Sequence, residues 1–187
     1  DPVAFDWGPD GKLWVAEMAD YPLGIDEKGT FAGRVRYLED TNGDGKYDKS
    51  TVFLDGLGYP TGVMAWRNGV IVTTAPEVFY AEDTNGDGKA DLHESLYTGF
   101  GEGNQQHRVN GLRWGLDNWI YLANGDSGGD LVSTKTGEKL NLSRRDLRIR
   151  PDTGLMDAQS GQTQFGRERD DWGNWFGSNN SNPAFHY

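Results

Sequence analysis

The chain has 187 residues, a net charge of −11 at pH 7 and no cysteine. The negative charge argues against nucleic acid and anionic membrane surfaces as partners, because both need a basic protein face. The lack of cysteine excludes disulfides, thiolate zinc sites and covalent c-type haem on this chain. Aromatic residues make up 12% of the chain and glycine occurs 27 times, which favours an all-β protein over a helical or disordered one.

No stretch of the sequence approaches the apolar length of a transmembrane helix. The chain opens on Asp1 rather than on a methionine, and no signal peptide is visible. The sequence therefore predicts no transmembrane segment. It suggests a processed or excised piece of an exported protein, periplasmic or extracellular.

A recurring pattern of strand, tight polar turn and aromatic strand runs along the chain. It occupies residues 3–16, 62–72 and 111–123, with a weaker copy at 171–177. Asp-Gly and Asn-Gly pairs supply the positive φ angles that such hairpin turns need. Further strands are predicted at residues 34–38, 51–54, 78–80, 95–97 and 146–150. These would form outer hairpins beside the inner ones.

This arrangement predicts an all-β fold, a β-propeller, in a single domain over residues 1–187. The expected blades are residues 1–58, 59–103, 104–161 and an incomplete 162–187. Because a propeller closes with about four to eight blades, we expect this chain to be part of a larger propeller or to be completed by another chain. The alternative is a small closed fold with four irregular blades.

A near-verbatim repeat is the strongest motif in the sequence. Residues 37–48 return as residues 80–91, and the copies differ only where Leu38 becomes Ala81 and Tyr47 becomes Ala90. Each copy places acidic or amide oxygens at alternate positions around a glycine-permitted turn, which is typical of a calcium loop. The spacing between the copies also matches the period of a propeller blade.

Calcium is the cofactor that these loops predict, with a structural role at the outer hairpins. The expected ligands are Asp40, Asn42, Asp44, Lys46 (by its carbonyl) and Asp48 in the first loop, and Asp83, Asn85, Asp87, Lys89 (by its carbonyl), Asp91 and Glu94 in the second. The first loop has Thr51 where an EF-hand carries its last, bidentate glutamate. Flanking β-branched and aromatic residues predict strands rather than EF-hand helices. The alternative is a plain hairpin turn whose Asp and Asn side chains bond their own backbone.

His107 is the candidate catalytic residue. It lies in the polar segment 104–111, just before the third inner hairpin, where a propeller loop can reach the mouth of the central channel. A histidine suits the removal of a hydroxyl proton while hydride leaves the adjacent carbon. We expect the polar loop 124–129 to lie at the end of the same strand pair that is opposite to His107. The alternative for His107 is a structural hydrogen bond, and His93 and His186 are expected to have no role in chemistry.

The segment from His107 through Gly128 resembles the histidine-bearing blade of the soluble quinoprotein glucose/sorbosone dehydrogenases. The chain as a whole more closely resembles the membrane-bound dehydrogenase domain of planctomycete and verrucomicrobial proteins, in which the run at residues 39–46 and 82–89 recurs. The resemblance implies a six-bladed propeller that uses calcium and pyrroloquinoline quinone, with His107 as general base. It places Asn110 and Asp126 as possible cofactor contacts. The chain departs from the pattern at residues 59–62, where the dehydrogenases carry a glutamine.

Three functions are open from the sequence. The first is a quinone-dependent oxidoreductase acting on a sugar-like alcohol. The second is a non-catalytic, calcium-stabilised propeller that binds carbohydrate or a protein partner through an aromatic-rich face, although we expect most of the seven tryptophans to serve blade packing. The third is a propeller lactonase, in which a central calcium polarises a carbonyl.

Overall fold

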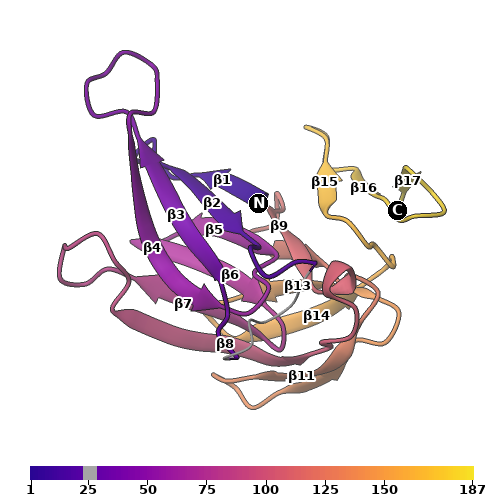
Figure 1. The fold of residues 1–187 in the computed structure, drawn as a ribbon. Coiled ribbons are helices and arrows are strands. Elements are labelled where there is room, and N and C mark those ends of the chain that lie inside the picture. The colour runs from indigo at the N-terminus through magenta and orange to yellow at the C-terminus, as the bar shows by residue number, and fades with distance from the viewer. Residues whose placement is uncertain (23–28) are drawn as a thin grey trace. The chain divides into compact units, whose positions relative to one another are not determined.

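The computed structural model describes residues 1–22 and 29–187, and these residues form antiparallel strands joined by turns and loops (Figure 1). The only helical element in the described ranges is a 3-10 turn, η1 (Gln105–His107). The strands are β1 (Pro2–Trp7), β2 (Leu13–Glu17), β3 (Gly33–Glu39), β4 (Lys49–Leu57), β5 (Gly62–Trp66), β6 (Gly69–Thr74), β7 (Glu77–Glu82), β8 (Leu92–Phe100), β9 (Asn110–Trp114), β10 (Ile120–Ala123), β11 (Gly129–Ser133), β12 (Lys139–Asn141), β13 (Asp146–Arg150), β14 (Leu155–Gln159), β15 (Arg167–Arg169), β16 (Trp175–Gly177) and β17 (Phe185–His186). The predicted all-β class is confirmed.

The described chain divides into two compact units. The first comprises residues 1–74 and 79–94, and the second comprises residues 75–78 and 95–187. Strands β7 and β8 contribute residues to both units.

The first unit is built around a four-stranded sheet with the order β1-β2-β3-β4. Strands β5 and β6 form a second antiparallel pair, in register from Gly62 opposite Thr73 to Trp66 opposite Gly69. The core between them is aromatic. Trp14, Tyr37 and Phe53 are buried, and the Trp14 ring centroid lies 5.1 Å from that of Tyr37 and 4.8 Å from that of Phe53. These large rings pack in one buried cluster with aliphatic residues such as Val35 and Val70, and their burial stabilises this unit.

The second unit contains a four-stranded sheet with the order β14-β13-β10-β9 and a three-stranded sheet β15-β16-β17. The inner strands are aliphatic, with Ile120 opposite Ile149 and Leu122 opposite Leu147, all four fully buried. In this unit β11 pairs with β8 and with β12. The sequence pattern did not predict β11 and β12, because the segment 129–141 alternates short apolar runs with turn residues and lacks an aromatic strand.

The expectation that most tryptophans serve blade packing is met only in part. Trp14 and Trp66 are buried and Trp119 and Trp175 are half-buried, but Trp7 is 59% exposed and Trp172 is 85% exposed, and Trp114 is exposed as well. Strand position therefore did not determine tryptophan burial. Trp7 alternates with inward residues on β1 and faces away from the core, and Trp172 lies at the tip of the turn between β15 and β16.

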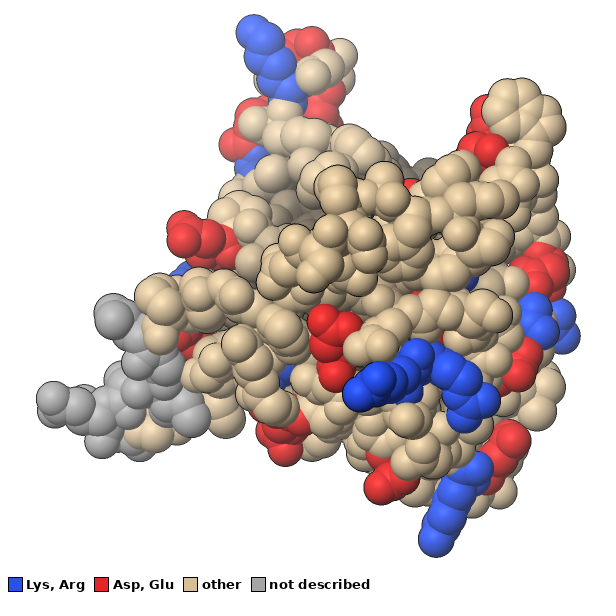
Figure 2. All heavy atoms as spheres, turned by 90° about the vertical axis from the view of Figure 1, so that its right-hand side faces the viewer, with Lys and Arg blue, Asp and Glu red and all other residues tan. Residues whose placement is uncertain are grey.

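Charged side chains of both signs are interspersed on the face drawn in Figure 2, and uncharged residues cover most of it. Such a surface differs from the continuous basic stripe that nucleic acid selects. Within the described ranges, no helix has the length and apolar character that crossing a membrane requires.

Candidate functional site

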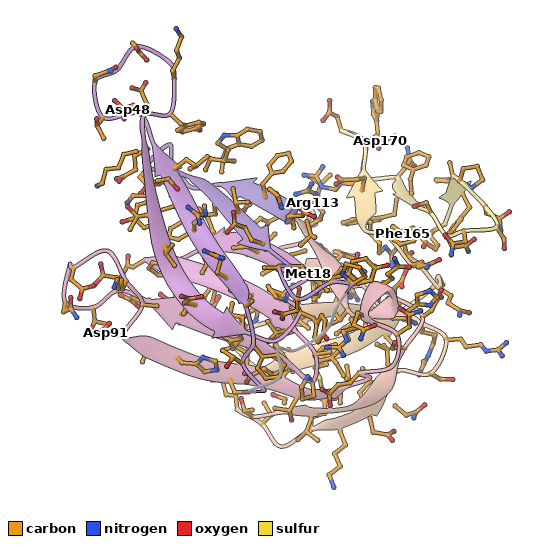
Figure 3. The ribbon with its side chains drawn as sticks, viewed as in Figure 1. Met18, Asp48, Asp91, Arg113, Phe165 and Asp170 are labelled. Atoms are coloured by element: carbon orange, nitrogen blue, oxygen red, sulfur yellow. The ribbon has the colours of Figure 1, made fainter. Side chains whose placement is uncertain are left out.

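The two repeated loops lie at the tips of hairpins, as Figure 1 shows. Residues 40–48 connect β3 to β4, and residues 83–91 connect β7 to β8. Strands flank both loops, so the prediction of β-flanked loops rather than EF-hands is confirmed. Asp48 and Asp91 mark the two loops in Figure 3.

The first loop is folded around the carboxylate of Asp40. Its Oδ2 accepts a hydrogen bond from the Gly45 N–H at 2.8 Å, and its Oδ1 accepts one from the Gly43 N–H at 2.7 Å. These N–H groups, that of Gly45 foremost, lower the pKa of Asp40 below its usual value. The Asn42 side-chain oxygen accepts from the Asp44 N–H at 2.9 Å. The sequence wraps in this way because Gly43 and Gly45 both adopt positive φ.

The second loop repeats this geometry. Asp83 accepts from the N–H groups of Gly88 at 2.8 Å and Gly86 at 2.6 Å, and the Gly88 bond is the main cause that lowers the pKa of Asp83. Asp91 closes the loop by accepting from the Thr84 N–H at 2.7 Å and the Thr84 hydroxyl at 2.8 Å. The Thr84 backbone bond likewise lowers the pKa of Asp91. Both carboxylates are therefore held ionised.

All of the predicted calcium ligands offer oxygen donors at the surface. Hard oxygen donors are the type that Ca²⁺ prefers. Their carboxylates are turned to backbone N–H groups, and within the described ranges no three His, Asp or Glu side chains gather into a metal-holding group. Glu94 lies within β8 and is exposed. The donor set fits calcium, and the described geometry is also that of the alternative, a self-bonded turn.

The two loops contact their surroundings differently at one position, which is Tyr47 in the first copy and Ala90 in the second. The Tyr47 hydroxyl accepts from the Trp7 indole N–H at 3.0 Å and donates to the Gly11 carbonyl at 3.3 Å. In the second loop the Ala90 N–H donates to the Phe53 carbonyl of β4 at 2.9 Å. The second loop is thus bonded to another hairpin through its backbone.

His107 ends the 3-10 turn η1, which the Asn104 side chain caps by accepting from the Gln106 N–H. Its imidazole is partly exposed, with Nδ1 3.7 Å from Asp126 Oδ2. On the other side, Nε2 lies 2.9 Å from Nε2 of Gln164. The site therefore presents a histidine between a carboxylate and an amide.

The placement of the polar loop 124–129 corrects the sequence-based expectation. In the antiparallel pair of β9 and β10, Asn110 lies opposite Ala123, so the loop before β9 and the loop after β10 meet at the same end of the hairpin. Asp126 approaches His107 for this reason. The carboxylate is held by Gln162, whose side-chain N–H donates to Asp126 Oδ1 at 3.0 Å.

Asn110 holds the backbone of the site together. Its side-chain N–H group donates to the carbonyls of Arg108 and Gln164, each at 2.8 Å, and its oxygen accepts from the Gly166 N–H at 2.7 Å. These bonds connect the His107 loop to residues 164–166. The amide that the resemblance placed at a cofactor is thus bonded to the main chain on both of its ends.

Gln164 and Asp146 are residues of this region that the sequence analysis missed. Asp146 is fully buried and accepts from the Asn124 and Thr163 N–H groups, each at 3.0 Å. It connects the base of the 124–129 loop to the segment that carries Gln164. A lone Asp at the start of a strand gives no pattern signal, so only the fold reveals this connection.

Replacing Gly125 by alanine is expected to destabilise the site strongly. A β-carbon at Gly125 would lie 2.0 Å from the Arg108 carbonyl oxygen, and Gly125 has a φ of +70°. A left-handed alanine costs on the order of 1 kcal/mol, and the backbone clash adds to that. Gly137→Ala is the matched control, because Gly137 has a φ of +72° but nothing near its β-carbon position. Urea unfolding curves of the two variants should differ by more than 1 kcal/mol, and equal losses would contradict the packing described here.

The comparisons with known proteins establish the family. A family model described as a domain of unknown function, DUF7133, matches residues 1–187. The chain belongs to this family. Among curated proteins, none matches this DUF7133 domain.

Two solved structures are compared with the DUF7133 domain. One is a chain in the crystal structure of a nidogen/laminin complex, with a TM-score of 0.51 and 10% identity over 95% of this chain and 72% of that chain. Another is a structural genomics protein of unknown function from Bacteroides thetaiotaomicron VPI-5482, with a TM-score of 0.48 and 10% identity over 94% of this chain and 51% of that chain. The nidogen/laminin likeness shows that the DUF7133 domain has a β-propeller-like all-β fold.

Proposed function

We propose that this domain is a calcium-stabilised part of a larger β-propeller, and that its His107 loop removes a hydroxyl proton from a sugar-like alcohol during oxidation. The observation that carries the proposal is the pairing of His107 Nδ1 with Asp126 Oδ2 at 3.7 Å. The two side chains come from loops that meet at one end of the hairpin formed by β9 and β10. Both remain partly exposed, so a small polar molecule can reach them.

The chemistry assigned to this chain is the proton half of an alcohol oxidation. The imidazole of His107 takes the proton of the substrate hydroxyl, and the Asp126 carboxylate stabilises the imidazolium that forms. The carbonyl C=O forms as the adjacent C–H bond breaks, and a two-electron acceptor such as a quinone would take its hydride. His107 and Asp126 thus act on the hydroxyl and not on the acceptor.

A quinone such as pyrroloquinoline quinone carries carboxylates and needs cations to hold it. The two buried arginines beside the site, Arg108 and Arg167, do not offer that. Arg108 is buried and donates to the Glu102 carbonyl at 2.9 Å, and Arg167 is buried against Asp146. Arg108 and Arg167 therefore do not form a quinone-carboxylate site beside His107, and no residue of this region is assigned to the quinone.

The test is dye-linked oxidation of aldoses and sugar alcohols in the presence of pyrroloquinoline quinone and calcium. The activity is expected to fall by about 10²-fold or more in His107→Ala, the range that loss of a general base produces. Asp126→Asn should lower the rate less, because the imidazole itself remains. His93→Ala is the control and should leave the rate unchanged, since the His93 ring stacks on Phe79 with centroids 4.0 Å apart. Full activity in His107→Ala would refute the catalytic role.

A second candidate is carbohydrate binding without catalysis, and the exposed aromatic rings of β1 favour it. Phe5 and Trp7 are both more than half exposed and lie edge to face with ring centroids 5.2 Å apart. The Trp7 indole is oriented by its bond to Tyr47. Planar rings fixed at a surface suit stacking against the apolar face of a sugar. Sugar-dependent quenching of tryptophan fluorescence that is lost in Trp7→Ala, without any oxidation, would support this second function.

A further inference from the structure

Gln164 is held in a single orientation by its surroundings. The residue is 1% exposed, and its side-chain oxygen accepts a hydrogen bond from the Asn180 N–H at 3.1 Å. A backbone N–H can only donate, so the atom facing Asn180 must be the amide oxygen. The backbone of Gln164 is held as well, because its N–H donates to the Ser178 carbonyl at 3.0 Å and its carbonyl accepts from Asn110.

The orientation of this amide decides the role of each nitrogen of His107. With its oxygen bonded to Asn180, Gln164 presents its NH₂ group to His107 Nε2 at 2.9 Å. An amide NH₂ group donates and does not accept, so Nε2 must accept through its lone pair. The proton of the neutral imidazole then belongs on Nδ1, the nitrogen that faces Asp126 Oδ2 at 3.7 Å.

We propose that Gln164 is a positioning residue that fixes His107 as the tautomer protonated on Nδ1, with its Nε2 lone pair held by the Gln164 amide. The consequence for catalysis rests on the proposed function. The lone pair that would take the substrate proton is bonded to the Gln164 amide, so this bond must break before Nε2 can accept from a substrate hydroxyl.

The experiment is a long-range ¹H–¹⁵N correlation spectrum of the ¹⁵N-histidine-labelled protein, recorded where the imidazoles are neutral. The chain has only three histidines, and His107→Ala assigns the signal. We expect an unprotonated Nε2 and a protonated Nδ1 for His107. In Gln164→Glu, a carboxylate oxygen replaces the NH₂ group and still accepts from Asn180, so Nε2 is expected to gain a proton.

Gln162→Ala is the matched control, because Gln162 donates to Asp126 and not to the imidazole. It should leave His107 Nε2 unprotonated. A proton on Nε2 in the unaltered protein, or an unchanged pattern in folded Gln164→Glu, overturns the inference. If Gln164→Glu does not fold, the spectrum of the unaltered protein still decides. If the protein oxidises no substrate but shows the expected protonation of the His107 nitrogens, the proposed function alone is refuted. If it oxidises substrate but carries its proton on Nε2, the proposed tautomer alone is refuted.

Discussion

Asp146→Ala is expected to lower the free energy of unfolding by about 3–5 kcal/mol, as removal of one member of a buried ion pair does. Asp146 is fully buried, and its Oδ2 lies 3.3 Å from Arg167 Nη1 and accepts from the Thr163 hydroxyl at 2.6 Å. The substitution would leave the buried Arg167 guanidinium without its carboxylate. Burial already lowers the pKa of Arg167, a sign that its charged form is costly there. Urea unfolding followed by tryptophan fluorescence measures the loss.

Asp157→Ala is the matched control for this prediction. Asp157 also pairs with an arginine, Arg148, at 2.7 Å and in the same sheet, but its side chain is 45% exposed. An exposed pair contributes only about 0–1 kcal/mol, so the control should change little. Asp146→Asn keeps the acceptor for the two N–H groups and removes only the charge, and it should lie between the other two. Similar losses for Asp146→Ala and Asp157→Ala would show that burial of the pair is unimportant.

Calcium is expected to raise the stability of the protein by about 2.7 kcal/mol per occupied loop at a concentration 100 times its Kd. For a chain of this size that corresponds to a rise in melting temperature of about 5–10 °C for each loop. The physical reason is that several carboxylates crowd at each hairpin tip, and a cation would neutralise their repulsion. Thermal melts in EDTA and in calcium measure the effect. Asp83→Ala should abolish the rise in melting temperature that calcium produces through the second loop, and Asp40→Ala the rise that it produces through the first.

Asp170→Ala is the control for the calcium effect. Asp170 also accepts from backbone N–H groups in a tight turn, those of Trp172 at 3.0 Å and Asn174 at 2.9 Å, and its pKa is lowered, mainly by Asn174. It lies outside the repeated loops, so its replacement should change stability equally with and without calcium. If calcium leaves the melting temperature of the unaltered protein unchanged, the loops are self-bonded turns and have no ion-binding role.

The hairpins could be predicted from sequence because their signals are local. Alternating apolar residues and Asn-Gly or Asp-Gly turns specify strand pairs such as β5 and β6 without reference to the rest of the chain. The strand β11 could not be found in this way, because its partner β8 lies some 30 residues earlier and the pairing depends on tertiary context. Local patterns predict which segments become strands better than they predict which strands become neighbours.

The His107 site shows the same limit. The sequence singled out His107 and Asp126, and hairpin geometry alone should have placed their two loops at one end of the strand pair. Gln164 was beyond reach, because it lies 57 residues from His107 and belongs to a glutamine-containing loop with no motif. Its role depends on one amide orientation, which only the contact with Asn180 determines.

The hydrogen bond from the Ala90 N–H to the Phe53 carbonyl connects the second repeated loop to strand β4 of another hairpin. An ion held there would restrict the motion of its own hairpin and that of β4 together, because the two share this bond. The first loop, attached through the Tyr47 side chain to the turn between β1 and β2, would transmit its ordering within its own sheet. Two nearly identical loop sequences thus differ in which strands would be ordered when an ion binds. The replacement of Tyr47 in the first loop by Ala90 in the second accompanies that difference.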